Sequence, residues 1–412
     1  MTDPAPWPTP PQSPYAAPPA SPHGAPPASP YAAPPASPYA GSAQGPYAGA
    51  PQQSPYPAPS SHPYGPPTGP RYDLPTPQGY QPLPSYGPPA AYPPAYPPVW
   101  PPAKPDPMPA HPVEYQHLLA GPRRAWWKPL VTLLLGVVGW IAVSAALTVG
   151  VLVVAAVLGE DGQALLTNQT APIGFGVGNL ILAALIPAAG LATWAVHRIR
   201  PGFLSSVTGR LRWGWLLTCM LALVPLWLGY LAIMLALDGQ FPPTPDPAAQ
   251  AGALIVLALL TTPLQAAGEE YFFRGLVIQQ VGAWVRNRWI ALLIAAVLSG
   301  LTFALAHGSL DPWILLDLVV FATVATLLTW RTGGLEAAIA IHVVHNVMTL
   351  LIGIIFGGFE ESFINTETTG SPLSTGVSAA VTITAGLVLW GLSRWRGVAR
   401  LSSPRGMLAQ PA

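Results

Sequence analysis

The chain has 412 residues, of which 8% are charged and 51% are apolar, whereas about a quarter of the residues in ordinary soluble domains are charged. Its mean hydropathy is positive, so the composition excludes a soluble globular protein and indicates a membrane protein. The formal net charge of +1 gives no reason to expect nucleic-acid binding. Because Cys219 is the only cysteine, an intramolecular disulfide and a cysteine metal cluster are excluded.

Residues 1–113 hold 40 of the 55 prolines, together with many Ala, Ser, Tyr and Gly residues. An imperfect eight-residue repeat runs through this segment, with serines in register at Ser13, Ser21, Ser29 and Ser37. Such a sequence cannot bury a core, so it predicts a disordered tail that is partly polyproline II. A solvated spacer is the simplest role, and the alternatives are an arm that docks on an aromatic-lined protein partner and a low-complexity segment that self-associates. Without a signal-peptide pattern, we expect the tail to be retained.

Beyond Trp126 the chain consists of eight apolar runs, and about 20 residues suffice to cross a bilayer as a helix. The runs cover residues 129–158, 172–196, 213–237, 251–282, 289–309, 312–330, 337–358 and 376–393. Backbone groups in lipid must be satisfied within their own segment, so all eight are expected to be helices. The sequence thus predicts an all-α polytopic membrane protein: a membrane domain over 114–400 with its core motifs in 250–350, and a short tail over 401–412.

The charges in the connections between these runs alternate in sign along the chain. Basic residues precede the first run, lie in every second connection and follow the last run: Arg123, Arg124, Lys128, Arg198, Arg200, Arg210, Arg212, Arg286, Arg288, Arg331, Arg394, Arg396 and Arg400. Acidic residues occupy the other connections: Glu160, Asp161, Asp238, Asp246, Asp311, Glu360, Glu361 and Glu367. By the positive-inside rule, both termini are expected on the cytoplasmic side of a bacterial-type cytoplasmic membrane.

Few ionisable side chains lie inside the runs: Glu269, Glu270, Arg274, His307, Asp317, Glu336, His342 and His345, with Asn346 as a polar companion. A charge at bilayer depth costs at least about 2.5–3.5 kcal/mol, and such residues usually face a protein interior and have a function there. Asp317 and Glu336 are interpreted as structural. The others mark a candidate site.

The first group of site residues contains two adjacent carboxylates and an arginine. Glu270 and Arg274 are i,i+4 neighbours on a helix and are suited to an ion pair. Glu269 points about 140° away from Arg274. One carboxylate can therefore be neutralised while Glu269 stays free to act as a general base.

The other two groups supply an aromatic ring, imidazoles and an amide. Phe303 and His307 share a helix face, and so do His342 and Asn346, whereas His345 lies about 60° from His342 and is either a neighbour or an alternate. A base, an imidazole that holds water and two polar donors suit water attack on an amide. Taken singly, each group has a structural explanation, such as a solvated helix cap or a helix-to-helix contact. Three such groups on three helices favour a site.

The three motifs are Glu269-Glu270-x-x-x-Arg274, Phe303-x-x-x-His307 and His342-x-x-x-Asn346. In this order they resemble the signature of the CAAX protease and bacteriocin-processing (CPBP, or Abi) family of intramembrane endopeptidases. The resemblance covers about residues 250–350. It implies that Glu269 is the general base, that His307 activates the water, and that His342 and Asn346 line the oxyanion site. Supporting roles fall to Glu270, Arg274, Phe303 and His345.

The resemblance leaves the cofactor and the substrate open. Family members were first described as metalloproteases, and some are now described as glutamate proteases that need no metal. We expect no cofactor, with a zinc ion held by Glu269, His307 and His342 as the alternative. The expected partners are the lipid bilayer and a peptide or protein substrate at the membrane, lipidated in the eukaryotic relatives. The alternative function is a non-catalytic transporter or scaffold that uses the same polar cluster for binding.

The depths of the motifs pose a geometric problem. His342 lies about 10 Å from the cytoplasmic end of its helix, whereas His307 lies about 27 Å from the start of its span near Trp289. Straight, upright helices would keep these side chains apart. We therefore expect long, tilted fourth and fifth helices around a water-filled cavity that opens to the cytoplasm.

Overall fold

The computed structural model describes residues 106–237, 239 and 244–403, and the statements below refer to these residues. Up to residue 105, the predicted disordered tail lies outside them. The described chain is helical, and its only β-pairings are two isolated bridges, Glu114 with Leu401 and Ser206 with Gly334. The predicted all-α fold class is confirmed.

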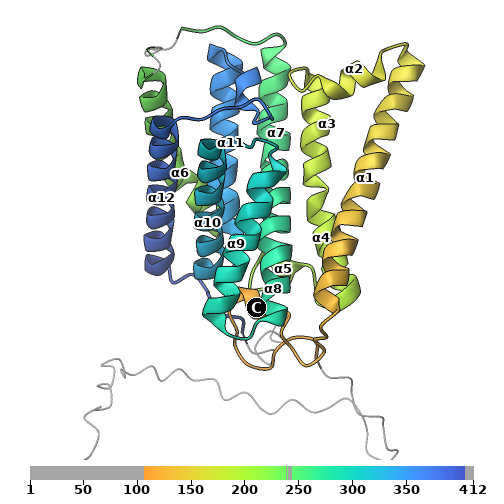
Figure 1. Cartoon of the computed structure of the whole chain (residues 1–412), viewed down its shortest axis with the longest axis vertical. Helices are drawn as coiled ribbons and strands as arrows, with labels where there is room; N and C mark the ends of the chain where they lie inside the picture. The colour runs from red at the N-terminus through yellow and green to blue at the C-terminus, as the bar shows by residue number, and fades with distance from the viewer. Residues whose placement is uncertain (1–105, 238, 240–243, 404–412) are drawn as a thin grey trace, which may run out of the picture. The chain divides into compact units, whose positions relative to one another are not determined.

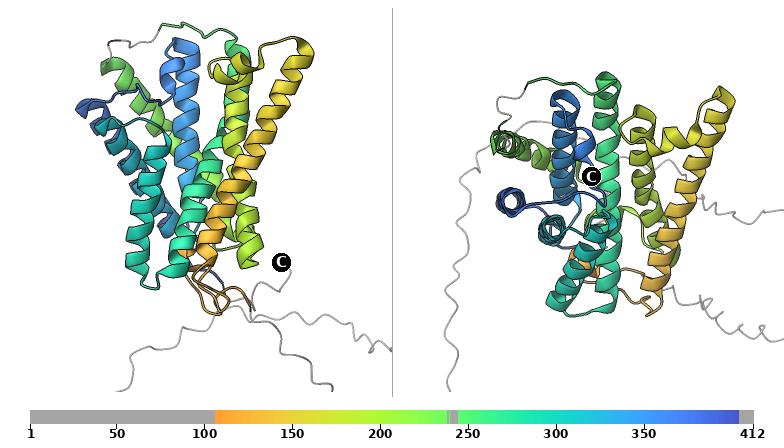
Figure 2. Two further views of the ribbon diagram at one scale, coloured as in Figure 1. Left: turned by 45° about the vertical axis from the view of Figure 1, so that its right-hand side comes forward. Right: turned by 45° about the horizontal axis from the view of Figure 1, so that its top comes forward.

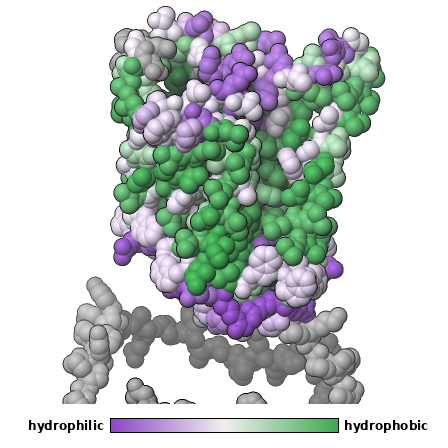
Figure 3. Space-filling model, viewed as in Figure 1, coloured by the Kyte–Doolittle hydropathy of each residue, from purple (hydrophilic) through white to green (hydrophobic). Residues whose placement is uncertain are grey.

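Eight spans of the described chain are long and apolar enough to cross a membrane. They are α1 (Lys128–Leu158), α3 with α4 (Pro172–Ala183 and Leu185–His197), α6 (Trp213–Leu237), α7 with η2 and α8 (Ala251–Glu270, Tyr271–Val277 and Ile278–Trp284), α9 (Arg288–Ala306), α10 (Pro312–Thr332), α11 (Glu336–Phe356) and α12 (Pro372–Trp395). Four short elements accompany them: η1 (Tyr115–His117), α2 (Gly162–Thr167), α5 (Gly202–Ser205) and η3 (Glu360–Ser362). The predicted number of spans is confirmed. Figure 3 shows the apolar band between two polar ends.

Successive spans run in opposite directions through the bundle (Figure 1). The basic connections therefore gather at one end, here called the basic end, where α1 starts and α4, α8, α10 and α12 finish. The acidic connections gather at the opposite, acidic end, which carries Glu160, Asp161, Asp246, Glu360, Glu361 and Glu367. An even number of spans places both ends of the membrane domain at the basic end, and its cytoplasmic location stays a prediction of the positive-inside rule.

The second span is broken between α3 and α4 at Ala184. Pro187 explains the break, because its ring lacks an N–H and clashes with the carbonyl four residues earlier. Helix α7 approaches the chain closely here: a Cβ atom on Gly268 would lie 2.2 Å from the carbonyl oxygen of Leu182. Only glycine allows that approach, so Gly268 fixes the position of the two glutamates that follow it.

The fourth span is unusually long, and this solves the problem of depth. Its 34 residues, Ala251–Trp284, cover about 50 Å, far more than the roughly 30 Å of a hydrocarbon core. Helix α9 starts from the far end of this span and ends short of the tops of α7 and α11 (Figures 1 and 2). The predicted long fourth helix is confirmed. The predicted long fifth helix is wrong, because α9 has 19 residues. His307 lies inside the bundle because α9 starts beyond the end of the long fourth span.

The chain ahead of α1 is folded into the base of the bundle. Tyr115 and Leu118 are fully buried, and Glu114 is 8% exposed. The Glu114 carboxylate accepts hydrogen bonds from Arg400 and, at 3.1 Å, from the indole N–H of Trp330. The segment thus ties the start of the membrane domain to its end.

The two buried carboxylates interpreted as structural both have partners. Glu336, at the start of α11, accepts two hydrogen bonds from the Arg212 guanidinium, from Nε at 2.8 Å and from Nη2 at 2.6 Å. Asp317 on α10 accepts a hydrogen bond from Ser378 on α12 at 3.0 Å. Both contacts join spans away from the candidate site, in agreement with the structural interpretation.

Candidate active site

Side chains from three separate motifs meet at one cavity of about 640 Å³. Glu269 comes from the end of α7, His307 from the residue after α9, and His345 and Asn346 from α11. His342 is 3% exposed and lies beside the cavity, in contact with the two glutamates. The motifs that are far apart in sequence therefore form a single site.

Glu270 and Arg274 form the predicted ion pair, and neither side chain is exposed at all. Arg274 Nη1 donates to Glu270 Oε1 at 3.0 Å. The guanidinium carbon lies 4.2 Å from the centroid of the Phe303 ring, a cation–π contact that adds to the stability of a buried cation. Charge neutralisation and aromatic packing together hold Arg274 inside the bundle.

The chain forms a π-helix, η2, directly after Glu270. Such widened turns are rare and occur frequently at functional sites. Arg274 lies in the middle of η2 and still reaches Glu270. The spacing of the sequence predicts a regular α-helix over this stretch, and the π-helix departs from that prediction.

Glu269 is held by a residue that the sequence analysis missed. Gln265, one turn earlier on α7, donates from Nε2 to Glu269 Oε1 at 2.6 Å. The carbonyl oxygen of the same Gln265 amide accepts a hydrogen bond from Asn346 Nδ2 at 3.2 Å. One glutamine thus orients both the carboxylate and the amide. Its only signal in the sequence is its position, four residues before Glu269 in an apolar run.

His342 lies between the two glutamates. Its Nδ1 is 2.8 Å from Glu270 Oε1 and its Nε2 is 3.6 Å from Glu269 Oε2. An ionised carboxylate only accepts, so Nδ1 carries the hydrogen, and Nε2 of the neutral ring is an acceptor. Among the described residues, Glu269 Oε2 has no hydrogen-bond partner. This oxygen is the acceptor that a general base would use.

His307 presents a second acceptor to the cavity. Its Nδ1 is 2.8 Å from the carbonyl oxygen of Phe303, and a carbonyl only accepts, so Nδ1 carries the hydrogen. Nε2 of the neutral ring is then free to accept a hydrogen bond from water. The Phe303 ring packs edge-on against both His307, at 4.7 Å between centroids, and His342, at 5.8 Å. Phe303 thereby fixes the orientation of both imidazoles.

The walls of the cavity reach one end of the bundle. They include Gln169 from the connection after α2 and Ser362, Phe363 and Ile364 from the connection after α11, all at the acidic end. No connection at the basic end contributes to the described lining. The predicted opening on the cytoplasmic side stays a prediction. The lining reaches the acidic end where α9 ends short of the tops of α7 and α11.

A metal site is not assembled from the side chains in place. In the described part of the chain, no three His, Cys, Asp or Glu side chains are grouped so that they could hold a metal ion. Glu269, His307 and His342, the ligands of the zinc alternative, therefore do not form such a group. His342 also has both ring nitrogens directed at glutamates.

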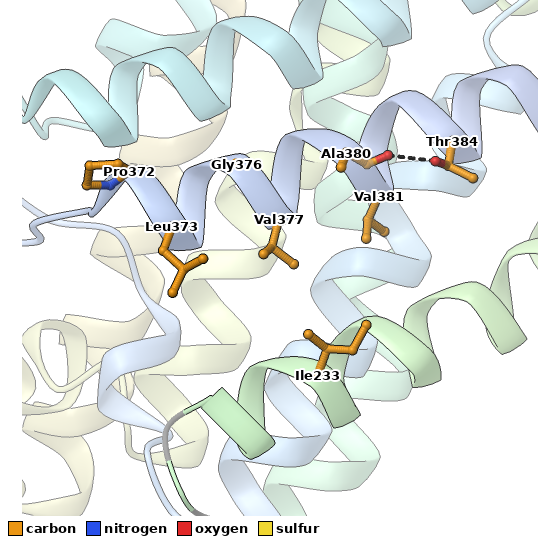
Figure 4. A pocket seen from close by; sticks show the side chains of 8 residues that line it. All are labelled: Ile233, Pro372, Leu373, Gly376, Val377, Ala380, Val381 and Thr384. Carbon is orange, nitrogen blue, oxygen red and sulfur yellow. Dashed lines mark hydrogen bonds between the residues drawn. The ribbon is translucent and has the colours of Figure 1, made fainter.

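A second, smaller hollow of about 430 Å³ lies between α6 and α12 (Figure 4). Its walls are apolar or small residues, among them Ile233, Leu373 and Val377. Its one hydroxyl, on Thr384, donates within its own helix to the Ala380 carbonyl at 2.7 Å. This hollow has no chemistry that could compete with the site around Glu269.

Fold and site together define a polytopic helical membrane protein with carboxylate, imidazole and amide groups at a buried cavity. Residues 251–348 match the family model described as type II CAAX prenyl endopeptidase Rce1-like. This segment contains all three motifs, and the match confirms the resemblance to the CAAX protease and bacteriocin-processing family.

One curated relative is the uncharacterized protein YyaK of Bacillus subtilis (strain 168), with 29% identity over 150 residues. The similar region covers 34% of this chain and 48% of YyaK, so the chain spans about half the length of this curated relative. No solved structure matches the chain.

Proposed function

We propose that the protein is an intramembrane endopeptidase that hydrolyses a peptide bond of a membrane-associated substrate, with Glu269 as the general base. One observation carries the proposal: Glu269 lines the cavity beside a neutralised Glu270–Arg274 pair, and one of its carboxylate oxygens has no hydrogen-bond partner in the described chain. The match of residues 251–348 to a family of CAAX prenyl endopeptidases supports the same activity.

The side chains support a sequence of steps. A water molecule, oriented by His307 Nε2, donates a proton to Glu269 while its oxygen attacks the carbonyl carbon of the peptide bond. Asn346 Nδ2 has two hydrogens, one of which is used by Gln265, and the other stabilises the developing oxyanion. Glu269 then passes its proton to the leaving amine as the C–N bond breaks. His342 donates its single N–H to Glu270, so its part is to position the two glutamates rather than to bond to the oxyanion.

The cavity walls favour a substrate with apolar character. Val137, Phe175 and Phe272 contribute apolar surface next to the polar groups. A peptide that enters from the bilayer, with or without an attached lipid, can bury its apolar parts against these residues. We infer that the substrate is a membrane protein or a membrane-anchored peptide.

The activity is tested by comparing peptide termini in membrane fractions of cells that carry the wild type and the Glu269→Gln variant. We expect a set of new N-termini that is present with the wild type and absent with the variant. If the two sets are identical while both proteins are present in equal amounts, the protease proposal fails and the transporter or scaffold alternative is favoured.

We also propose that hydrolysis needs no metal, because the candidate zinc ligands are not grouped. Treatment of the purified full chain with EDTA or 1,10-phenanthroline is expected to leave the cleavage rate unchanged. The assay is cleavage of a synthetic peptide that spans a Glu269-dependent site. A loss of activity that added Zn²⁺ restores would contradict this proposal and support the zinc alternative.

Gln265→Leu is expected to lower kcat by about 10- to 100-fold, because small displacements of reacting groups have effects of this size. The substitution removes the donor to Glu269 and the acceptor for Asn346. The same peptide assay measures kcat. Gln279→Leu is the matched control, since Gln279 is also buried on this span but bonds to the Phe203 carbonyl. An equal loss of kcat in both variants would show that Gln265 has no specific role.

A further inference from the structure

His345 has two different surroundings on its two ring nitrogens. Its Nδ1 is 3.0 Å from the indole nitrogen of Trp227, while the side chain as a whole lines the cavity with Glu269 and Asn346. An indole N–H is a donor only, so Nδ1 must accept. The neutral ring therefore carries its hydrogen on Nε2, and within the described chain the hydrogen bond of His345 is the one at Nδ1.

The ring of His345 is also fixed in space. Trp227 on α6 is 1% exposed and belongs to the main hydrophobic core. The indole meets the imidazole edge-on, with ring centroids 5.8 Å apart. Phe321 on α10 lies against the imidazole at 6.5 Å. The buried Trp227 thus determines the tautomer of His345, and together with the partly buried Phe321 it fixes the orientation of the ring.

A second polar side chain lies one turn further along the same face of α11. Thr349, at i+4 from His345, also lines the cavity, and its hydroxyl is buried without a partner among the described residues. The rise between these two positions is about 6 Å. Alternate residues of an extended peptide are about 6.8 Å apart. The two side chains are therefore spaced to meet successive carbonyls on one side of an extended chain.

We propose that His345 is a positioning residue for the substrate, and that its Nε2–H donates a hydrogen bond to a main-chain carbonyl of an extended peptide lying along α11. The inference rests on the proposed protease function. A neutral N–H donor suits a peptide carbonyl, which only accepts. Because this contact forms on binding and persists through the reaction, it contributes to KM more than to kcat.

Two substitutions at His345 separate this role from a structural one. In His345→Gln the amide nitrogen reaches the place of Nε2 and can still donate into the cavity, but the bond to Trp227 is lost. In His345→Asn the amide oxygen takes the place of Nδ1 and keeps the bond to Trp227, but nothing reaches the cavity. We expect KM close to wild type for the glutamine variant, and for the asparagine variant about a tenfold higher KM with kcat little changed.

The assay uses the full chain in proteoliposomes and a synthetic peptide that spans a Glu269-dependent cleavage site. A KM that rises in His345→Gln and stays at the wild-type value in His345→Asn would assign His345 a structural role and overturn the inference. Unchanged KM values in both variants would overturn it as well. If the wild type yields no Glu269-dependent cleavage, the proposed function fails too, and this outcome is distinct from the other two.

The bond from Trp227 provides an independent test with a matched control. Trp227→Phe frees Nδ1 and no longer fixes the tautomer, so KM is expected to rise about threefold. Trp215 lies on the same helix and in the same core, and its buried indole N–H has no partner in the described chain. Trp215→Phe is expected to leave KM unchanged. Equal KM values for the two phenylalanine variants would contradict the inference.

Discussion

Replacing Arg274 with alanine is expected to lower the free energy of unfolding by about 3–5 kcal/mol, the usual cost of breaking a buried ion pair. Glu270 is not exposed at all, and its charge would keep only the hydrogen bond from His342. The substitution also empties the space where the guanidinium packs against Phe303 and Phe321. Thermal unfolding of the purified protein in detergent micelles measures the effect, and catalytic activity should fall with it.

Two further variants test whether the unpaired charge of Glu270 causes the loss of stability in Arg274→Ala. Arg200→Ala removes an exposed arginine at the basic end and is expected to change stability by less than about 0.5 kcal/mol. The double variant Arg274→Met with Glu270→Gln removes both charges and keeps an acceptor for His342. It should recover much of the lost stability. A double variant that is as unstable as Arg274→Ala would mean that packing, rather than charge, dominates.

Glu269→Gln is expected to lower kcat by about 10²–10⁴-fold, the usual contribution of a general base, and to leave the fold intact. The amide oxygen of the new glutamine can still accept the bond that Gln265 now donates to Oε1. The new amide nitrogen replaces Oε2, which has no partner in the described chain and lies 3.6 Å from His342 Nε2. Peptide cleavage and thermal unfolding are measured on the same preparation.

The adjacent glutamate is the matched control for this prediction. Glu270→Gln leaves the base in place but removes the counter-charge of Arg274 and weakens the bond to His342. Its main effect is therefore expected on the unfolding temperature, with any loss of activity following the loss of folded protein. Full cleavage activity in Glu269→Gln would refute the role of Glu269 as the base.

The sequence predicts well those features that depend only on the order of residues along the chain. Span number follows from apolar runs and from the alternation of charge between them. The Glu270–Arg274 pair follows from helical spacing alone, and the confirmed ion pair needs no tertiary information beyond the helix. Both predictions are correct because neither feature depends on how the helices pack.

Features that depend on packing were not predictable in the same way. Gln265 is uncharged, so its presence in an apolar run is unremarkable until its partners on two helices are known. The π-helix after Glu270 leaves no distinct pattern in the sequence. The depth at which α9 ends beside the cavity depends on how far α8 extends before the chain turns at Arg288.

The position of the cavity has a consequence for how the two ends of the bundle could communicate. Glu114 lies at the basic end, ahead of α1, whereas the cavity walls reach the acidic end. Communication between the two would have to pass along the helices, and Glu114, which holds Arg400 and Trp330, is the first link in that path.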